Sequence, residues 1–406
     1  MWKFAAAEDI RVTNLVQMGN LARTHFDQPA WGEAGRFEQE GYVILSAQED
    51  PRTVQHGHTL HYNLEAPIHL ATDEYFAYHD AFEEVSRQGG SSGYAHHGQL
   101  FNGRRGLALD VPFGLVDFIE VLQNGRLATE PWYDYLNLGY KILPDAGSDF
   151  PYMDLPGVVR NYVAIDGPFS ADAWFEAFSR GNMYVTNGPF LEFTVNGQPM
   201  GSELNVPRNS RLEIVAEADI NPEVDSLSHL ELVVHGEVVA TQRADGSNRI
   251  TLRTEIPADR SKWIAVRAFG SKQDPSDMTA AHSAPIYVIV DGEPFWKQEA
   301  VPELVAQQRQ RLDEFLTAEV NPRGDLEPWE TLPLMEEEWE RQRAQLEARV
   351  NEARSRYAQL EARATGETAA AATRLAGSLV LLAGTLTALR IRLSRRRTRQ
   401  VDGASG

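Results

Sequence analysis

The hydrophobic pattern of roughly the first 168 residues predicts alternating strands and helices. Short apolar runs that predict strands lie at residues 11–16, 42–46, 93–96, 116–121 and 142–146. Between them, residues 73–87 have helical spacing and are followed by Gly89 and Gly90, which suit the C-terminus of a helix. Alternation of this kind predicts an α/β layer or barrel, whose functional groups gather at the carboxyl ends of its strands.

The pattern changes after residue 168. Ser170 suits the N-cap of a helix over residues 171–179, which Gly181 would end. Short β-rich runs then follow, separated by Gly, Asn, Asp and Pro, at residues 190–195, 211–218, 231–234, 249–254, 263–269 and 286–290. About six or seven short strands at this spacing are typical of a β-sandwich.

The last hundred or so residues are predicted to be helical. Their apolar positions follow the heptad spacing of a coiled-coil seam, at Leu346, Val350, Ala353, Tyr357, Leu360 and Ala364. Such a seam could join copies of the chain into a homo-oligomer.

Residues 375–389 carry no charge and precede a cluster of arginines. As a membrane span the segment is short, since about 20 residues are usual. The other interpretation is that the heptad seam continues through it. The anchor is slightly favoured because few polar positions remain, and a basic flank inside would place the catalytic part outside the cytoplasm. Without an anchor the chain is expected in the cytoplasm.

These patterns divide the chain into five parts. They are an α/β domain at 1–168, a linking helix and turn at 169–189, a β-sandwich at 190–295, a helical or coiled-coil region at 296–366, and an apolar helix with a basic tail at 367–406.

Composition narrows the possible functions. A chain of 406 residues is too long for one ordinary core, so two or more domains are expected. The formal net charge of -20 argues against a nucleic-acid partner, which would need a basic face. The absence of cysteine excludes disulfides, a thiolate nucleophile and Cys metal ligands.

Candidate chemistry begins where the apolar run at residues 42–46 ends. Glu49 lies just past it, and His56, His58 and His61 follow. His58 and His61 would share a face of a helix, whereas His56 and His58 would share a face of a strand. For any one of these histidines alone, an exposed loop position is the commoner situation.

Two further strand ends carry similar groups. His96 and His97 follow the run that begins at Gly93, and Asp149 follows the run at residues 142–146. Adjacent strand residues point to opposite faces, so we expect only one histidine, His96, to reach a shared site. A Glu, an Asp and several His at one edge of a sheet predict a divalent metal site, and these ligands do not separate zinc, manganese and iron.

Together these motifs resemble the CehA/McbA (carbaryl-hydrolase-like) metallohydrolases of the PHP superfamily. The resemblance runs through residues 46–52, 57–58, 93–96, 146–149, 157–163, 181–189 and 281–288, and covers roughly the first 295 residues. It implies a PHP-like domain, a distorted β/α barrel, followed by a β-sandwich, with the helical tail outside the family. By matching motif it implies Glu49, His58, His96 and Asp149 as metal ligands.

The chain departs from this family in two places. The family opens with a strand bearing His-x-His, and no such pair precedes Glu49. Pro151 stands where the PHP pattern often has a second His. We therefore expect a barrel that is incomplete at its N-terminus.

The resulting hypothesis is a metal-dependent hydrolase that cleaves ester, carbamate or phosphoester bonds of a small-molecule substrate through metal-activated water. His56, His61 and Arg160 are the candidates for proton transfer or substrate contact, with His97 as a further possibility. The alternative is a non-catalytic surface or ligand-binding protein with a degenerate metal site, oligomerised or anchored by its C-terminal helices.

Overall fold

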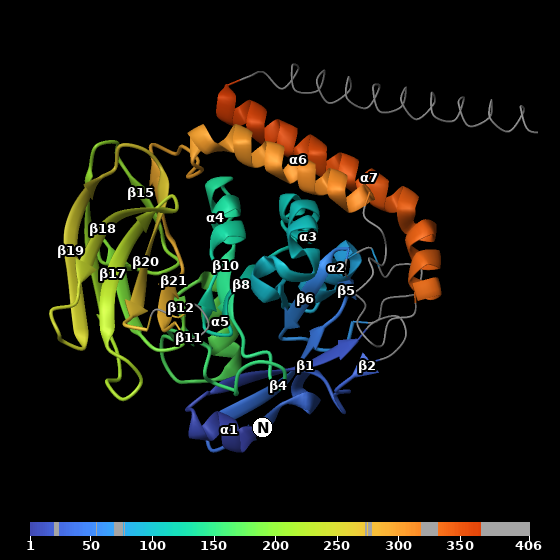
Figure 1. The fold of residues 1–406 in the computed structure, drawn as a ribbon, viewed down its shortest axis with the longest axis horizontal. Coiled ribbons are helices and arrows are strands. Elements are labelled where there is room, and N and C mark those ends of the chain that lie inside the picture. Colours follow the sequence, from blue (N-terminus) through green and yellow to red (C-terminus); the bar gives the residue numbers. More distant parts are fainter. Residues whose placement is uncertain are drawn as a thin grey trace, which may run out of the picture.

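A computed structural model describes residues 1–19, 24–53, 55–68, 76, 78–272, 274, 278–317 and 332–366. Over these residues an N-terminal sheet with its helices lies beside a β-sandwich, and two long helices cross one side of the molecule (Figure 1). No helix among the described residues is long and apolar enough to span a membrane. The segment at 375–389 lies outside the described residues.

Ten strands form the described part of the N-terminal sheet. They are β1 (Val12–Gly19), β2 (Thr24–His25), β3 (Phe37–Gln39), β4 (Tyr42–Glu49), β5 (Arg52–Thr53), β6 (Gly57–Tyr62), β7 (Ser91–Tyr94), β8 (Phe118–Gln123), β9 (Arg126–Leu127) and β10 (Leu143–Ala146). The helices around it are α1 (Trp2–Ala7), α2 (Tyr78–Arg87), α3 (Gly103–Asp110), α4 (Glu130–Asn137) and α5 (Ala171–Arg180), with short 3-10 turns at Gly32–Gly35, His96–Gly98 (η3), Leu100–Asn102 and Val111–Phe113.

The predicted β/α barrel is wrong. The described sheet is open, and its main path runs β10-β8-β7-β6-β4-β1-β2 without closing. It is also mixed, because β6 is antiparallel to both β4 and β7, whereas β1–β4, β7–β8 and β8–β10 are parallel. The sequence pattern placed five of the ten strands, which are β1, β4, β7, β8 and β10. It did not contain β6, and hydrophobic periodicity does not fix the direction in which strands pair.

The β-sandwich is built from two further sheets that enclose a second apolar core. One contains β11 (Arg160–Val163), β12 (Met183–Thr186), β15 (Glu203–Val206), β17 (Leu227–Val234), β18 (Glu237–Arg243), β20 (Lys262–Gly270), β21 (Ala280–Ser283) and β22 (Ile286–Val290). The other contains β13 (Phe190–Val195), β14 (Gln198–Pro199), β16 (Arg211–Asp219) and β19 (Arg249–Pro257). Along β16, alternate side chains are buried, as expected for a strand with one face on a core.

Two elements between the sheets differ from the expected boundaries. Strands β11 and β12 precede residue 190, yet β12 pairs with both β11 and β21, so both strands belong to the sandwich.

Helix α5 begins as predicted, because the Ser170 hydroxyl accepts a hydrogen bond from the Ala173 N–H, and Gly181 follows it with a positive φ.

The C-terminal helices α6 (Val301–Thr317) and α7 (Leu332–Thr365), which follow a 3-10 turn at Gln298–Ala300, lie side by side across α3 (Figure 1). The heptad positions of α7 are buried within the chain itself: Leu346, Val350, Ala353, Tyr357 and Ala364 belong to the main core, and Leu360 packs against it. The Tyr357 hydroxyl donates to the Ala108 carbonyl of α3 at 3.0 Å. Homo-oligomerisation through this seam stays a prediction that none of these contacts tests.

Packing of α7 on its own chain gives a first prediction. Leu346→Ala should lower the free energy of unfolding by about 2–5 kcal/mol, because it leaves a cavity in the core. The exposed neighbour gives the control: Glu347→Ala should change it by less than about 0.5 kcal/mol. Urea denaturation at two protein concentrations measures both. A Leu346→Ala effect that vanishes on dilution would place this side chain at an interface between copies instead.

A buried histidine in the sandwich gives a second prediction. His282 is fully buried, and burial lowers its pKa to about 3 although the Ser283 carbonyl opposes this shift. Since the folded pKa is depressed, the neutral imidazole contributes stability above about pH 6.5 that is lost as the pH falls below it, at up to about 1.4 kcal/mol per pH unit. His282→Gln should therefore show a shallower loss of stability between pH 6.5 and 4 than the wild type. Urea denaturation at several pH values measures this, and equal slopes would contradict it.

Candidate metal centre

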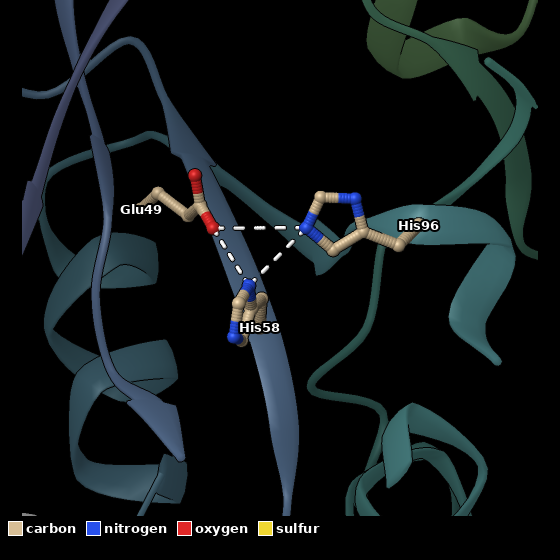
Figure 2. A group of neighbouring side chains, drawn as sticks. All are labelled: Glu49, His58 and His96. Atoms are coloured by element: carbon tan, nitrogen blue, oxygen red, sulfur yellow. Dashed lines mark hydrogen bonds and ion pairs between the residues drawn. The ribbon is translucent and has the colours of Figure 1, made fainter. Parts of the chain in front are cut away.

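Three strand ends bring Glu49, His58 and His96 together (Figure 2). Glu49 is the last residue of β4, His58 is the second residue of β6, and His96 follows β7 in the turn η3. The antiparallel pairing of β6 with β7 continues past the strand, where the Ala95 N–H donates to the His58 carbonyl at 3.1 Å. This register sets the start of β6 beside the end of β7.

The ligand atoms of the three side chains converge on one point. Nδ1 of His58 lies 3.0 Å from Oε1 of Glu49 and 3.2 Å from Nε2 of His96, and that Nε2 lies 3.9 Å from the same Oε1. Ligands held 2.0–2.2 Å from a tetrahedral zinc ion would be separated by about 3.3–3.6 Å. Among the described residues, none donates a well-aligned hydrogen bond to the buried Oε1 of Glu49. One carboxylate and two imidazoles in this arrangement can bind a divalent metal ion.

The charge states in this group follow from burial and from its neighbours. Burial alone would raise the pKa of Glu49, but Arg52, His58 and His96 outweigh it, and the pKa lies well below its usual value. Burial lowers the pKa of His58 to about 3. Burial also opposes the charge on His96, yet the Glu49 carboxylate raises that pKa to about 9. Glu49 is therefore a carboxylate and His58 a neutral imidazole, and a metal would displace a proton from His96.

The backbone and a buried carboxyl hold His96 in place. His96 and His97 both have positive φ values, 55° and 62°, which are uncommon for residues other than glycine. The His96 N–H donates to Oε2 of Glu120 at 2.5 Å, and its Nδ1 lies 3.2 Å from Oε1 of Gln123. With these two contacts the Nε2 atom is left facing Glu49.

Glu120 is a site residue that the sequence analysis missed. It lies in the middle of β8, a fully buried strand, and burial raises its pKa to about 8. Gly147 makes room for it, because a Cβ atom there would lie 2.5 Å from Oε1 of Glu120. The available signal was the presence of two carboxylates, Asp117 and Glu120, inside the strand predicted at residues 116–121.

A cavity of about 690 Å³ reaches the group formed by Glu49, His58 and His96, which we call the metal group. Glu49 and His96 lie on its wall, and so do Asp149 and Arg160. Asp149 is outside the three-residue group, although its charge adds to the rise in the pKa of His96. Arg160 donates to the Glu8 carbonyl at 2.9 Å and pairs with the Glu8 carboxylate at 3.3 Å.

The remaining predicted histidines face elsewhere. Because β6 is a strand, His58 and His61 point to opposite sides of the sheet, and His61 lies 2.9 Å from the Ser92 hydroxyl and 3.1 Å from that of Thr59. His56 contacts Asp110 at 3.0 Å and stacks on Tyr78 with ring centroids 3.7 Å apart. The His97 ring lies 3.1 Å from the Arg126 carbonyl. Of the described residues on the cavity wall, none is His56, His61 or His97.

Comparison with known proteins adds little. No family model matches the chain, and no curated protein matches it. One similar solved structure, of fibronectin(III)-like modules of Clostridium thermocellum CbhA, is 21% identical, covers 25% of this chain and 98% of that chain, and has a TM-score of 0.17. A likeness at that score carries no argument, and the resemblance to the CehA/McbA family stays a prediction.

The geometry gives a third prediction. Metal-free wild-type protein should bind zinc, with His58 as one of the ligands, and His58→Ala should weaken zinc binding by more than about 100-fold. A loss of that size is larger than the one expected for a residue that only contacts a metal ligand. His61→Ala is the matched control, since it removes an equally buried imidazole from the other face of β6. Isothermal titration calorimetry and elemental analysis measure both variants. Equal zinc affinity in wild type and His58→Ala would rule out this ligand group.

Proposed function

We propose that this protein is a metal-dependent hydrolase that cleaves ester, carbamate or phosphoester bonds. The observation that carries the proposal is the buried group of Glu49, His58 and His96, of which Glu49 and His96 line a large cavity. Buried ionisable groups with strongly shifted pKa values beside a cavity are typical of catalytic sites. The motif resemblance to the CehA/McbA hydrolases is in keeping with it and rests on sequence alone.

The protein's own residues would divide the work between them. When bound, a divalent ion supplies Lewis-acid and water-activating chemistry. Glu49, His58 and His96 would hold it, with Glu120 fixing the orientation of His96 through the backbone N–H. Asp149 lies on the wall of the same cavity, outside this group of three. Zinc, manganese and iron all suit this set of ligands.

The cavity favours a small substrate with an apolar group. Its wall includes the apolar side chains of Ile10, Phe150, Phe169 and Trp174 as well as the polar ones named above. Phe150 and Phe169 are 41% exposed, so aromatic surface is presented to solvent at the cavity. Large exposed apolar side chains gathered at a cavity mark a ligand surface. We expect an ester or carbamate with an apolar substituent to fit best.

A second candidate function is a non-catalytic binding protein with a degenerate metal site. The observation that favours it is the guanidinium of Arg52, which lies 3.6 Å from Oε1 of Glu49 and so already supplies a positive charge there. On this alternative the cavity binds its apolar ligand without hydrolysing it.

Hydrolysis tests the proposal directly and forms the fourth prediction. Zinc- or manganese-loaded protein should hydrolyse p-nitrophenyl esters or phosphoesters, and Glu49→Gln should reduce kcat/KM by at least about 100-fold, because the variant lacks the ligand carboxylate. His229→Ala, in the sandwich and outside the cavity, is the control and should keep full activity. Bound metal without turnover of any ester, carbamate or phosphoester would favour the binding protein instead.

A further inference from the structure

Arg52 lies against the metal group although it is not one of the three candidate ligands. Its strand β5 pairs with β6 so that Arg52 stands opposite His58. Its side chain is 5% exposed, and its Nη2 atom lies 3.4 Å from Nδ1 of His58. Its Nε atom lies 3.6 Å from Oε1 of Glu49. A guanidinium therefore faces the two ligand atoms that would also face a metal ion.

The arrangement resembles a site for two cations that share one carboxylate. In two-metal centres the ions lie about 3.5–4 Å apart and bridge common oxygen ligands. Here the Glu49 Oε1 atom faces both Arg52 and the gap between His58 and His96. A divalent ion in that gap would lie only a few ångströms from the guanidinium, at a depth where charges are weakly screened.

We infer that Arg52 is a resident cation that takes the place of a second metal ion and weakens the binding of the first. This inference rests on the proposed metal-dependent function, since it concerns the same three ligands. The site then takes one divalent ion per chain. Without metal, Arg52 compensates the buried Glu49 carboxylate, and with metal the two positive charges repel each other.

The inference makes two linked predictions for Arg52→Met, which keeps most of the side-chain volume and removes the charge. Zinc affinity should rise by at least about tenfold, because the repulsion between the cations is gone. In EDTA the melting temperature of Arg52→Met should be lower than that of wild type, because the Glu49 carboxylate loses a compensating charge. The rise in melting temperature on adding zinc should then be larger for Arg52→Met than for wild type. A merely structural role for Arg52 would lower the melting temperature without raising zinc affinity.

Two further variants complete the experiment. Arg52→Lys keeps the positive charge and should bind zinc within about threefold of wild type, and Arg52→Gln replaces Arg52→Met if the latter does not fold. Calorimetry with zinc on the full chain measures affinity and stoichiometry, and thermal unfolding with and without zinc measures stability.

The outcomes separate this inference from the proposed function. Zinc bound once by wild type and more tightly by Arg52→Met supports both. Zinc bound by Arg52→Met alone supports the inference and removes the metal-dependent function of the natural chain. Equal or weaker binding by Arg52→Met, or two zinc ions in wild type, overturns the inference and leaves the hydrolase proposal standing. No binding by either protein overturns both.

Discussion

The buried carboxylate of Glu49 is the constraint on which the candidate site depends. An ionised carboxylate removed from water costs several kcal/mol unless charges and hydrogen bonds compensate it. Here the compensation comes from Arg52 and from a protonated His96, and both are themselves nearly buried. A metal ion could take the place of the proton on His96, whereas the guanidinium of Arg52 would stay beside the Glu49 carboxylate. The three candidate ligands and Arg52 can therefore stay together in the folded protein, as a cluster of compensating charges, without a bound metal ion.

Strand β6 is the element that assembles this cluster. It pairs with β5 on one side and with β7 on the other, so that its second residue, His58, meets Arg52 and the turn that carries His96. Pairing of β6 with β4 positions Glu49 next to the same point. Its other face carries Thr59 and His61, which are buried and hydrogen-bonded to each other and to their neighbours. A polar strand can be buried in this way only because each of these groups has a partner.

That polarity explains why the sequence pointed to the three candidate ligands but not to strand β6. Glu49 and His96 follow apolar runs, and such runs mark strand ends reliably. Residues 57–62 contain two histidines and a threonine, and all six are buried, so this strand shows no hydrophobic alternation to detect. Without β6, the remaining alternation of strands and helices favoured a barrel, and the chain's mixed, open sheet could not be foreseen. Asp149 illustrates the same limit, because its distance from Glu49, His58 and His96 depends on how β10 is placed in the sheet.

The heptad of α7 shows that a periodic seam specifies a partner surface and not the partner. Its apolar positions were correctly expected to be buried in a helix interface, but the interface lies against α3 and α6 of the same chain. Helix α6 in turn brings Phe315 to within 5.0 Å of the His56 ring, measured between centroids, so the helices that follow the sandwich return to the sheet that carries the metal group. The hydrophobic core of the N-terminal sheet is thereby completed by residues about 250 positions later in the chain. Loss of these helices would uncover the buried ring of His56, which directly precedes β6, the strand whose register holds the metal group together.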